Sequence, residues 1–369
     1  MELKYLESNN ISILQTNTKT RRLGYLKIII ELFETSNYYP TTYLNRHVEN
    51  ICFKYIDELK DYGTKKGDDK GLIKLTSNGS SAKPYIELLE QLNLLTQINH
   101  SYILTKQSKI YFHLNKTVTQ NDNIFKLNTL DKLFFLRQIL KVDSLYILGI
   151  LNIIYTSQQP LSTIKIKEQF VAYIIKELDL NQQNTDNNVT KRKIMELKIR
   201  ILSWKKPITY LEHIIEPRIN WLVDLGILEI KLDTKEKKYC LSSFGFNFVN
   251  ILSEISDKNL NKSLVIESIL NNNYFLIFNS TFDLNKVKSN LNINKIDEYL
   301  LEAFQIFKTE APNRIAASQA IDYVCFNSFL KDNLILEFED IKKHLQGFNN
   351  NFSMDWFRTE NDGALYLKK

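Results

Sequence analysis

The sequence predicts a mainly α-helical protein with short β-hairpins, arranged in more than one domain. Ten glycines and six prolines in 369 residues are few, which disfavours sheet-rich folds with many tight turns. Hydrophobic residues make up 44% of the chain and aromatic residues 12%, which is enough for two or three packed cores. In addition, a pattern of helix, stop and strand occurs twice.

The clearer copy of this pattern spans residues 216–242. Pro217 fits the first turn of a helix, and Gly226 can take the left-handed conformation that ends one. The chain then continues into an apolar strand, a charged turn at 235–238 and a second strand. This segment therefore predicts a short helix followed by a β-hairpin.

The other copy spans residues 80–105. Ser80 or Ser81 is the expected N-cap of a helix that starts at Ala82, and the turn Asn99-His100 is expected to join two strands. Asn93 stands where the second copy has Gly226, and asparagine tolerates the left-handed conformation.

Both copies resemble the endings of bacterial winged-helix domains, of the form Leu-Glu-x-Leu-Gly-Leu-Leu followed by Tyr-x-Leu-Thr. The matching segments are Leu89-Glu90-Gln91-Leu92-Asn93-Leu94-Leu95 with Tyr102-Ile103-Leu104-Thr105, and Leu222-Val223-Asp224-Leu225-Gly226-Ile227-Leu228 with Tyr239-Cys240-Leu241-Ser242. The resemblance covers about half the chain and is at the level of a superfamily. It implies tandem winged helix-turn-helix domains, as in accessory subunits of bacterial DNA-handling or phage-defence complexes.

Three domains are expected on this basis. Residues 1–120 form a first winged helix, with helices at 21–33 and 42–59, an exposed loop at 62–71, a strand at 72–75, the helix from Ala82 and a wing ending near Leu114. Residues 124–255 form a second, with helices at 131–140, 144–155 and 164–178, a loop at 181–188 and a basic helical insertion before Pro217. Residues 256–369 form a helical domain, with helices at 296–308, 316–330 and 338–345 and a hairpin at 352–367. We interpret this domain as a third, degenerate winged helix.

The basic insertion is the strongest candidate for binding a polyanion. Against the single acid Glu196 it has seven bases, namely Lys191, Arg192, Lys193, Lys198, Arg200, Lys205 and Lys206. On a helix, residues 191, 198 and 205 share one face, which suits contact with the phosphates of a duplex. The alternative is an ordinary solvated face in a lysine-rich chain.

The predicted recognition helices offer further DNA-binding candidates. Near Pro217, Arg218 and Asn220 are the residue types that read guanine and adenine in the major groove. Arg218 pairing with a neighbouring acid is the alternative. In the first helix, Lys83 and the preceding serines suit one phosphate at the helix terminus. Because Glu87 and Glu90 would repel phosphate, a protein–protein role is favoured there.

Charge is unevenly distributed along the chain. Residues 296–369 contain twelve acids and eight bases, whereas the whole chain has a net charge of +6. A polyanion is therefore expected to bind the first 295 residues, and the acidic C-terminal region is expected to face a protein partner.

Catalytic, metal and membrane functions are not indicated. The three cysteines are isolated, the five histidines form no ligand pair, and the chain shows no glycine-rich phosphate loop. The pattern Asp224 with Glu229-Ile230-Lys231 resembles metal-dependent nucleases, but its carboxylates are too close in sequence for the usual hairpin. No signal peptide opens the chain, and its longest apolar run is short for a bilayer, which predicts a cytoplasmic protein.

The sequence thus predicts a non-enzymatic, cytoplasmic subunit without cofactors that binds double-stranded DNA. The backbone would be bound through residues 191–206 and bases through the Pro217 helix. The competing hypotheses are a scaffold whose winged helices bind only protein, and the DNA-recognition part of a restriction system.

Overall fold

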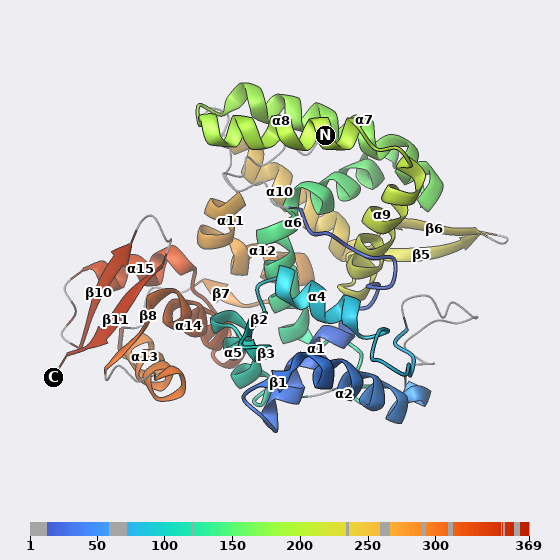
Figure 1. Ribbon diagram of the computed structural model, residues 1–369. Coiled ribbons are helices and arrows are strands. Elements are labelled where there is room, and N and C mark those ends of the chain that lie inside the picture. The colour runs from blue at the N-terminus through green and yellow to red at the C-terminus, as the bar shows by residue number, and fades with distance from the viewer. Residues whose placement is uncertain are drawn as a thin grey trace. The chain divides into compact units, whose positions relative to one another are not determined.

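The protein is described from a computed structural model. The structure describes residues 13–58, 72–119, 121–233, 236–258, 266–288, 293–308, 313–347, 349, 351–357 and 362–368. It divides into two compact units, Met1–Ile266 and Glu267–Lys369. Helices dominate both units, and their strands form small sheets (Figure 1). The predicted class, mainly α with short β-hairpins, is confirmed.

The first part of unit 1 has a helix, a strand, two further helices and a hairpin, which we call the first repeat. Its elements are α1 (Gly24–Glu31), β1 (Tyr39–Pro40), α2 (Thr41–Lys54), α4 (Lys83–Gln91), β2 (Leu95–Ile98) and β3 (Ser101–Leu104). The strands form an antiparallel sheet in the order β1-β3-β2. Asn99 and His100 both have positive φ angles, 47° and 61°, as a two-residue hairpin turn requires.

Two expectations for the first repeat were wrong. Residues 72–75 form no strand, since the amide of Ile73 bonds the hydroxyl of Tyr25, and β1 takes the place at the sheet. Residues after the hairpin are helix α5 (Lys106–Asn115), not part of a wing, because Thr105 caps a new helix by accepting from the amide of Ser108. The predicted loop at 62–71 lies outside the described residues.

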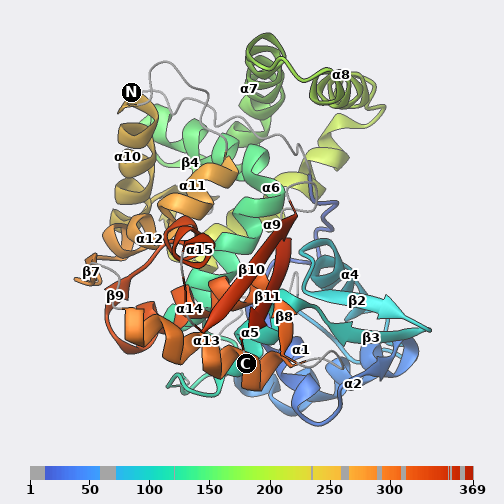
Figure 2. The same cartoon turned by 90° about the vertical axis from the view of Figure 1, so that its left-hand side faces the viewer.

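The second repeat follows the same order with one additional helix. Its elements are α6 (Thr129–Ser157), β4 (Leu161–Ser162), α7 (Thr163–Asn184), α8 (Asn188–Leu202), α9 (Pro207–Asp224), β5 (Leu228–Asp233) and β6 (Glu236–Leu241), and α10 (Ser243–Lys258) follows. The sheet order is β4-β6-β5, again antiparallel. The additional helix α8 runs beside α7, and the two form a helical hairpin (Figures 1 and 2).

The loop predicted at residues 181–188 is shorter than expected. Helix α7 continues to Asn184, and α8 begins at Asn188, so only three residues join them. The side chain of Asn187 accepts from the amides of Val189 and Thr190 and thereby caps α8. The basic segment therefore belongs to a tight helical hairpin.

Helix α6 is the central core helix of unit 1. Two helices were expected here, and α6 does consist of two helical segments that meet at a kink at Asp143, whose φ and ψ are −143° and 22°. By length and composition α6 could cross a membrane, with a mean hydropathy of 1.5 in its most apolar window. Because 78% of that window is buried inside the structure, a core role accounts for its apolar character.

Pro217 does not begin a helix, as the sequence had suggested. Helix α9 starts ten residues earlier at Pro207, and Pro217 lies inside it. A proline in a helix leaves the carbonyl four residues before it without an amide donor. Here the hydroxyl of Thr16 donates to that carbonyl, on His213, so the helix continues without a lost hydrogen bond.

Unit 2 contains a third repeat of the same order. After α11 (Ile266–Asn272) and α12 (Tyr274–Phe282) come α13 (Ile293–Phe307), β8 (Arg314–Ala316), α14 (Ala317–Lys331), α15 (Phe338–Gln346), β10 (Phe352–Phe357) and β11 (Asp362–Leu367). These three strands form an antiparallel sheet in the order β10-β11-β8. Short strands β7 (Val287–Lys288) and β9 (Leu334–Ile335) pair in parallel. The expected hairpin at 352–367 is confirmed, and its turn lies outside the described residues.

Candidate nucleic-acid interface

The helix before the hairpin in the first repeat, α4, has its N-terminal end already occupied by a carboxylate. Glu49 of α2 is buried, and its side chain accepts from the amides of Thr76, Ser81 and Ala82 at 2.7, 2.7 and 3.3 Å. Neither serine is the N-cap, since that position falls on Ala82. The predicted phosphate site at this helix end is therefore corrected, because a protein anion binds these amides.

The exposed side of α4 carries both signs of charge. Lys83 is exposed and pairs with Glu87, one turn along the helix, at 3.6 Å. Glu90 is partly buried and accepts from the hydroxyl of Tyr102 at 3.3 Å. Lys83 is thus available at the surface, but as one member of an ion pair.

Arg218 and Asn220 do not face solvent, which overturns their predicted role as base readers. Arg218 is 0% exposed, and its guanidinium donates to both carboxylate oxygens of Asp143 at 2.6 and 2.9 Å. The Asn220 amide is 7% exposed and donates to the carbonyl of Glu216 at 2.7 Å. The wrong expectation followed from treating Pro217 as the start of α9, which placed these residues at an exposed helix terminus.

The buried pair of Arg218 and Asp143 connects three segments of unit 1. The guanidinium also donates to the carbonyl of Leu14 at 2.9 Å and to the hydroxyl of Thr16 at 2.8 Å. The ring of Tyr146 lies 5.0 Å from it. Burial raises the pKa of the Asp143 carboxyl, and the facing guanidinium opposes that shift.

A second ion pair attaches the same N-terminal segment to the end of α9. The carboxylate of Asp224 accepts from the amide of Leu23 at 2.8 Å and pairs with Arg22 at 3.4 Å. The indole of Trp221 donates to the carbonyl of Thr20 at 2.6 Å, and Trp221 is a core residue. We call residues 13–23 the N-terminal strap, because they join α9 of the second repeat to the first repeat.

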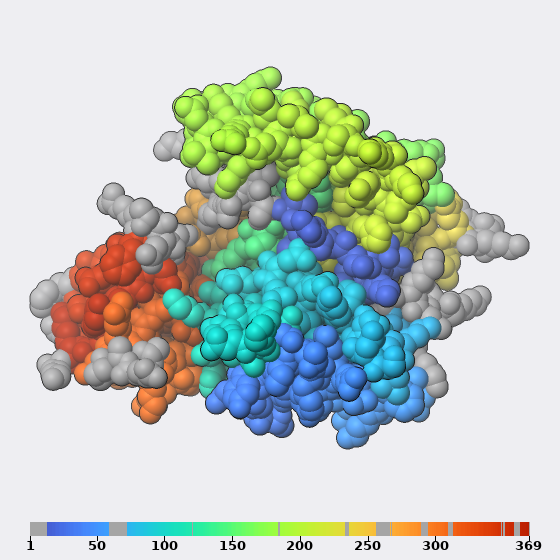
Figure 3. Space-filling view, in the orientation of Figure 1, coloured from blue at the N-terminus to red at the C-terminus, as the bar shows by residue number. Residues whose placement is uncertain are grey.

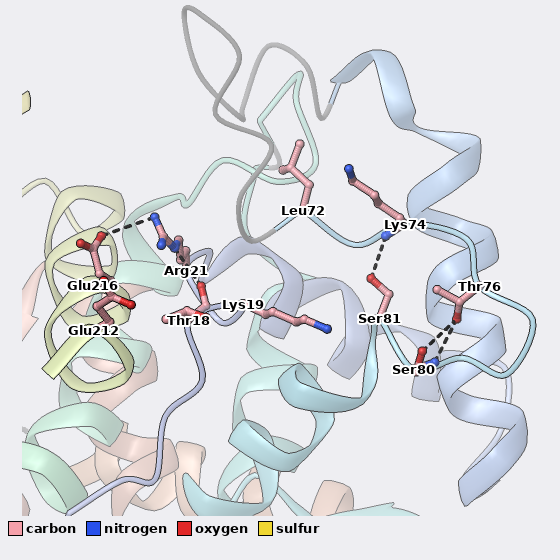
Figure 4. A pocket seen from close by; sticks show the side chains of 10 residues that line it. All are labelled: Thr18, Lys19, Arg21, Leu72, Lys74, Thr76, Ser80, Ser81, Glu212 and Glu216. Carbon is pink, nitrogen blue, oxygen red and sulfur yellow. Dashed lines mark hydrogen bonds and ion pairs between the residues drawn. The ribbon is translucent and has the colours of Figure 1, made fainter. Parts of the chain in front are cut away.

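The strap, the turn before α4 and helix α9 together line a pocket of ≈ 560 Å³ on unit 1 (Figure 4). Its lining residues are Thr18, Lys19, Arg21, Leu72, Lys74, Thr76, Ser80, Ser81, Glu212 and Glu216. The side chain of Lys19 extends from the strap toward Ser81 (Figure 4). In the space-filling view the strap lies between the surfaces of α9 and α4 (Figure 3).

The acids in this pocket already have cationic partners within the fold. Glu216 pairs with Arg21 at 3.4 Å and with Lys167 at 3.3 Å, and Glu212 lies 4.0 Å from Lys167. Lys19 and Lys74 are exposed at the pocket. The pocket therefore presents cations to solvent while its carboxylates are compensated.

The basic segment 191–206 is divided by the structure. Lys191, Arg192, Lys193, Lys198 and Arg200 lie on α8, whereas Lys205 and Lys206 precede α9. Lys198 pairs with Asp179 of α7, and Arg192 pairs with Glu196 at 2.9 Å. A helix is present as predicted, but it ends at Leu202, so Lys205 does not share a helix face with Lys191 and Lys198 as expected.

The start of α9 combines exposed cations with an aromatic pair. Lys205, Lys206, Thr209 and Tyr210 are exposed, and the rings of Trp204 and Tyr210 stack with centroids 5.4 Å apart. Glu212, which lines the pocket, lies six residues after Lys206, or about 9 Å along the helix axis. The exposed lysines before α9 and the pocket-lining part of α9 are therefore close to each other along the chain.

Sequence reasoning missed Lys19 and Lys74 as candidate site residues. The run Lys19-Thr20-Arg21-Arg22 was a usable signal, since it places three bases directly before the first helix. Nothing comparable marked Lys74, because its position depends on the turn that Glu49 organises.

The residues of the nuclease-like pattern have other contacts in the structure. Asp224 is held by Arg22 and the strap, while Glu229 of β5 lies 3.7 Å from Lys231. Among the described residues no three His, Cys, Asp or Glu side chains gather as metal ligands would. Comparison of the chain with protein-family models, with curated proteins and with solved structures finds no match.

Proposed function

We propose that this chain is a non-enzymatic subunit that binds double-stranded DNA with tandem winged helices. In each of the three repeats the first strand pairs with the last strand of a terminal hairpin, and the helix before that hairpin stands where a winged helix has its recognition helix. The recognition helices would be α4, α9 and α15. This order, repeated three times, supports the winged-helix interpretation in a way that the two sequence copies alone did not.

The observation that carries the proposal is the cationic surface around α4 and α9. Lys19 and Lys74 are exposed at the pocket between these helices, and Lys205 and Lys206 are exposed just before α9. Lysines in such positions bind backbone phosphates, which fixes a protein on a duplex without reading its sequence. Lys83, as well as the cations of α8, would add longer-range attraction.

Sequence reading, if it occurs, would come from the start of α9 and not from Arg218. The exposed Thr209 and Tyr210 lie in the first turn of α9, and the N-terminal turns of a recognition helix are the ones that enter a major groove. Hydroxyl groups contact several bases, so a modest sequence preference is expected.

Helix α15 of unit 2 is a poor candidate for DNA contact. Glu339 and Asp340 stand in its first turn, where phosphate would be repelled. Unit 2 also contains the whole acidic C-terminal region, residues 296–369. We therefore assign unit 2 to a protein partner, within a bacterial DNA-processing or defence complex in the cytoplasm.

Salt dependence of duplex binding tests the proposal. With four phosphate contacts log affinity falls with log salt with a slope of about −3.6, so a fourfold rise in salt weakens binding about 150-fold. Fluorescence anisotropy with a labelled duplex of mixed sequence measures this. The variant Lys19→Ala/Lys74→Ala should bind more weakly and with a shallower slope, by about 2.

The matched control removes two lysines outside the pocket, Lys109→Ala/Lys126→Ala, which are also exposed. If both double variants lost the same amount of duplex affinity, the loss would be explained by net charge alone and not by the pocket. If the chain bound no duplex even at low salt, the DNA-binding proposal would be refuted and the protein-scaffold hypothesis would be favoured.

The scaffold hypothesis has one structural observation in its favour, which is an exposed aliphatic surface on α8. It does not exclude DNA binding by the pocket and α9. The restriction-system hypothesis would additionally require a nuclease partner.

A further inference from the structure

Helix α8 has an aliphatic row on the side that faces solvent. Met195, Ile199 and Leu202 are spaced i, i+4 and i+7, and they are 50%, 60% and 68% exposed. The opposite side of the helix packs on α7 through Thr190, Ile194, Leu197 and Ile201, which are buried. We call Met195, Ile199 and Leu202 the α8 row.

Two further aliphatic residues in this part of the chain are exposed. Ile208, in the first turn of α9, is 72% exposed, and Val189 at the start of α8 is 65% exposed. Both views of the fold show α8 lying beside α7 (Figures 1 and 2). An apolar patch on the surface of a protein often marks a site where another molecule binds.

Positive charge borders the α8 row on both sides. At 100° per residue, Lys191 lies along one side of the row and Arg192 along the other, and Arg200 and Lys193 follow further round. The only acid in α8 is Glu196, and it pairs with Arg192. A complementary surface would therefore have an aliphatic centre and acidic edges.

We propose that the α8 row is a docking surface for an acidic amphipathic α-helix of a partner protein. Aliphatic residues at i, i+4 and i+7 form a ridge of the kind that fits the groove of a second helix. Glutamates beside the apolar positions of that helix would meet Lys191, Arg192 and Arg200. Their attraction sets the orientation and speeds association more than it adds affinity.

Three other occupants fit the surface less well. A duplex would meet aliphatic side chains at the centre of the exposed arc, where phosphate contact needs cations. A membrane-surface helix needs a broad apolar face, but here the other half of the helix is buried on α7. A second copy packed through the same row would bring its own cations against those of the first.

The test uses two synthetic helical peptides and the full-length chain. One peptide has leucines at i and i+3 or i+4 with glutamates at the flanking positions, and the other has lysines in place of the glutamates. Fluorescence anisotropy of the labelled peptides measures binding. We expect the acidic peptide to bind, and the basic peptide to bind at least about tenfold more weakly.

Variant pairs then locate the bound peptide. Leu202→Glu should weaken binding of the acidic peptide at least about tenfold, because it places a carboxylate in the aliphatic row, where it is desolvated and repels the glutamates of the peptide. The matched control Leu232→Glu changes the same residue type on β5, where Leu232 is 72% exposed, and should leave peptide affinity unchanged. Ile199→Lys is a second variant of the row. It should also weaken binding of the acidic peptide, because it replaces an aliphatic side chain of the row by a charged one.

Several results would overturn the proposal. These are failure of the acidic peptide to bind, equal binding of both peptides, and equal losses in Leu202→Glu and Leu232→Glu. Loss of duplex affinity in Leu202→Glu would assign the row to DNA, and loss of vesicle binding, measured with anionic phospholipid vesicles, would assign it to membrane. Self-association of the full chain that Leu202→Glu abolishes would assign the row to a second copy. DNA binding by Lys19 and Lys74 stands or falls separately in the salt titration.

Discussion

Replacing Arg218 by alanine is expected to destabilise unit 1 strongly while leaving the choice of DNA sequence unchanged. Both Arg218 and Asp143 have side chains that are 0% exposed, and two short hydrogen bonds join them. Removing the arginine leaves a carboxylate buried without its cation. Breaking a buried pair in this way costs about 3–5 kcal/mol, since the remaining charge stays desolvated.

The structure also predicts how far a second substitution restores stability. Arg218→Met combined with Asp143→Leu removes both charges and fills similar volume, which by itself can be close to neutral. However, Leu14 loses two partners in the double variant, because its amide donates to Asp143 at 3.2 Å and its carbonyl accepts from Arg218. Each buried backbone group left without a partner costs about 1–3 kcal/mol, so recovery should be partial.

Urea unfolding followed by circular dichroism measures these differences. A lower midpoint with an unchanged slope indicates a loss of stability and not a change of compactness. The control is Arg192→Ala, because Arg192 forms an exposed pair with Glu196 that should contribute less than about 1 kcal/mol. If Arg218→Ala stayed within about 1 kcal/mol of the parent and altered the preferred duplex sequence, the structural role of Arg218 would be refuted.

Three further predictions follow from the site. Glu49→Gln should destabilise the turn before α4 by about 1–3 kcal/mol, because several amides lose their charged acceptor, and amide hydrogen exchange in that turn should speed up. Thr16→Val should cost about 1–2 kcal/mol in urea unfolding, whereas Thr16→Ser should cost little, since the hydroxyl bonded to the His213 carbonyl is kept. Lys205→Ala/Lys206→Ala should reduce the salt slope of duplex binding by about 2 in anisotropy titrations, and an unchanged slope would remove these lysines from the interface.

Local sequence patterns predicted much of the helix and hairpin content. The hairpin of the first repeat follows from two residues that tolerate positive φ between apolar strands. A helix in the basic segment 191–206 was also expected, but its bounds, 188–202, were not. The break in α6 at Asp143 falls between the two helices expected there, whereas the true start of α9 depends on a tertiary partner. Thr16 compensates for Pro217 from about 200 positions away, and no local pattern contains that information.

The candidate site was predicted less well for the same reason. A buried arginine and a base-reading arginine cannot be told apart in the sequence. Asp143, the acid that pairs with Arg218, stands 75 positions earlier. The alternative stated for Arg218, pairing with an acid, was right in kind, but the partner was Asp143 and not a neighbour. Lysines at the pocket were missed since three separate segments converge there.

The N-terminal strap has a consequence for how the chain folds as it is synthesised. Thr20 and Leu23 bond residues 221 and 224, which are about 200 positions further along. The strap therefore lacks these partners until α9 has left the ribosome. Closing a loop of this length also slows folding. During that interval the apolar surfaces around α1 are exposed to other chains, so dependence on chaperones is expected to concentrate in the first half of synthesis.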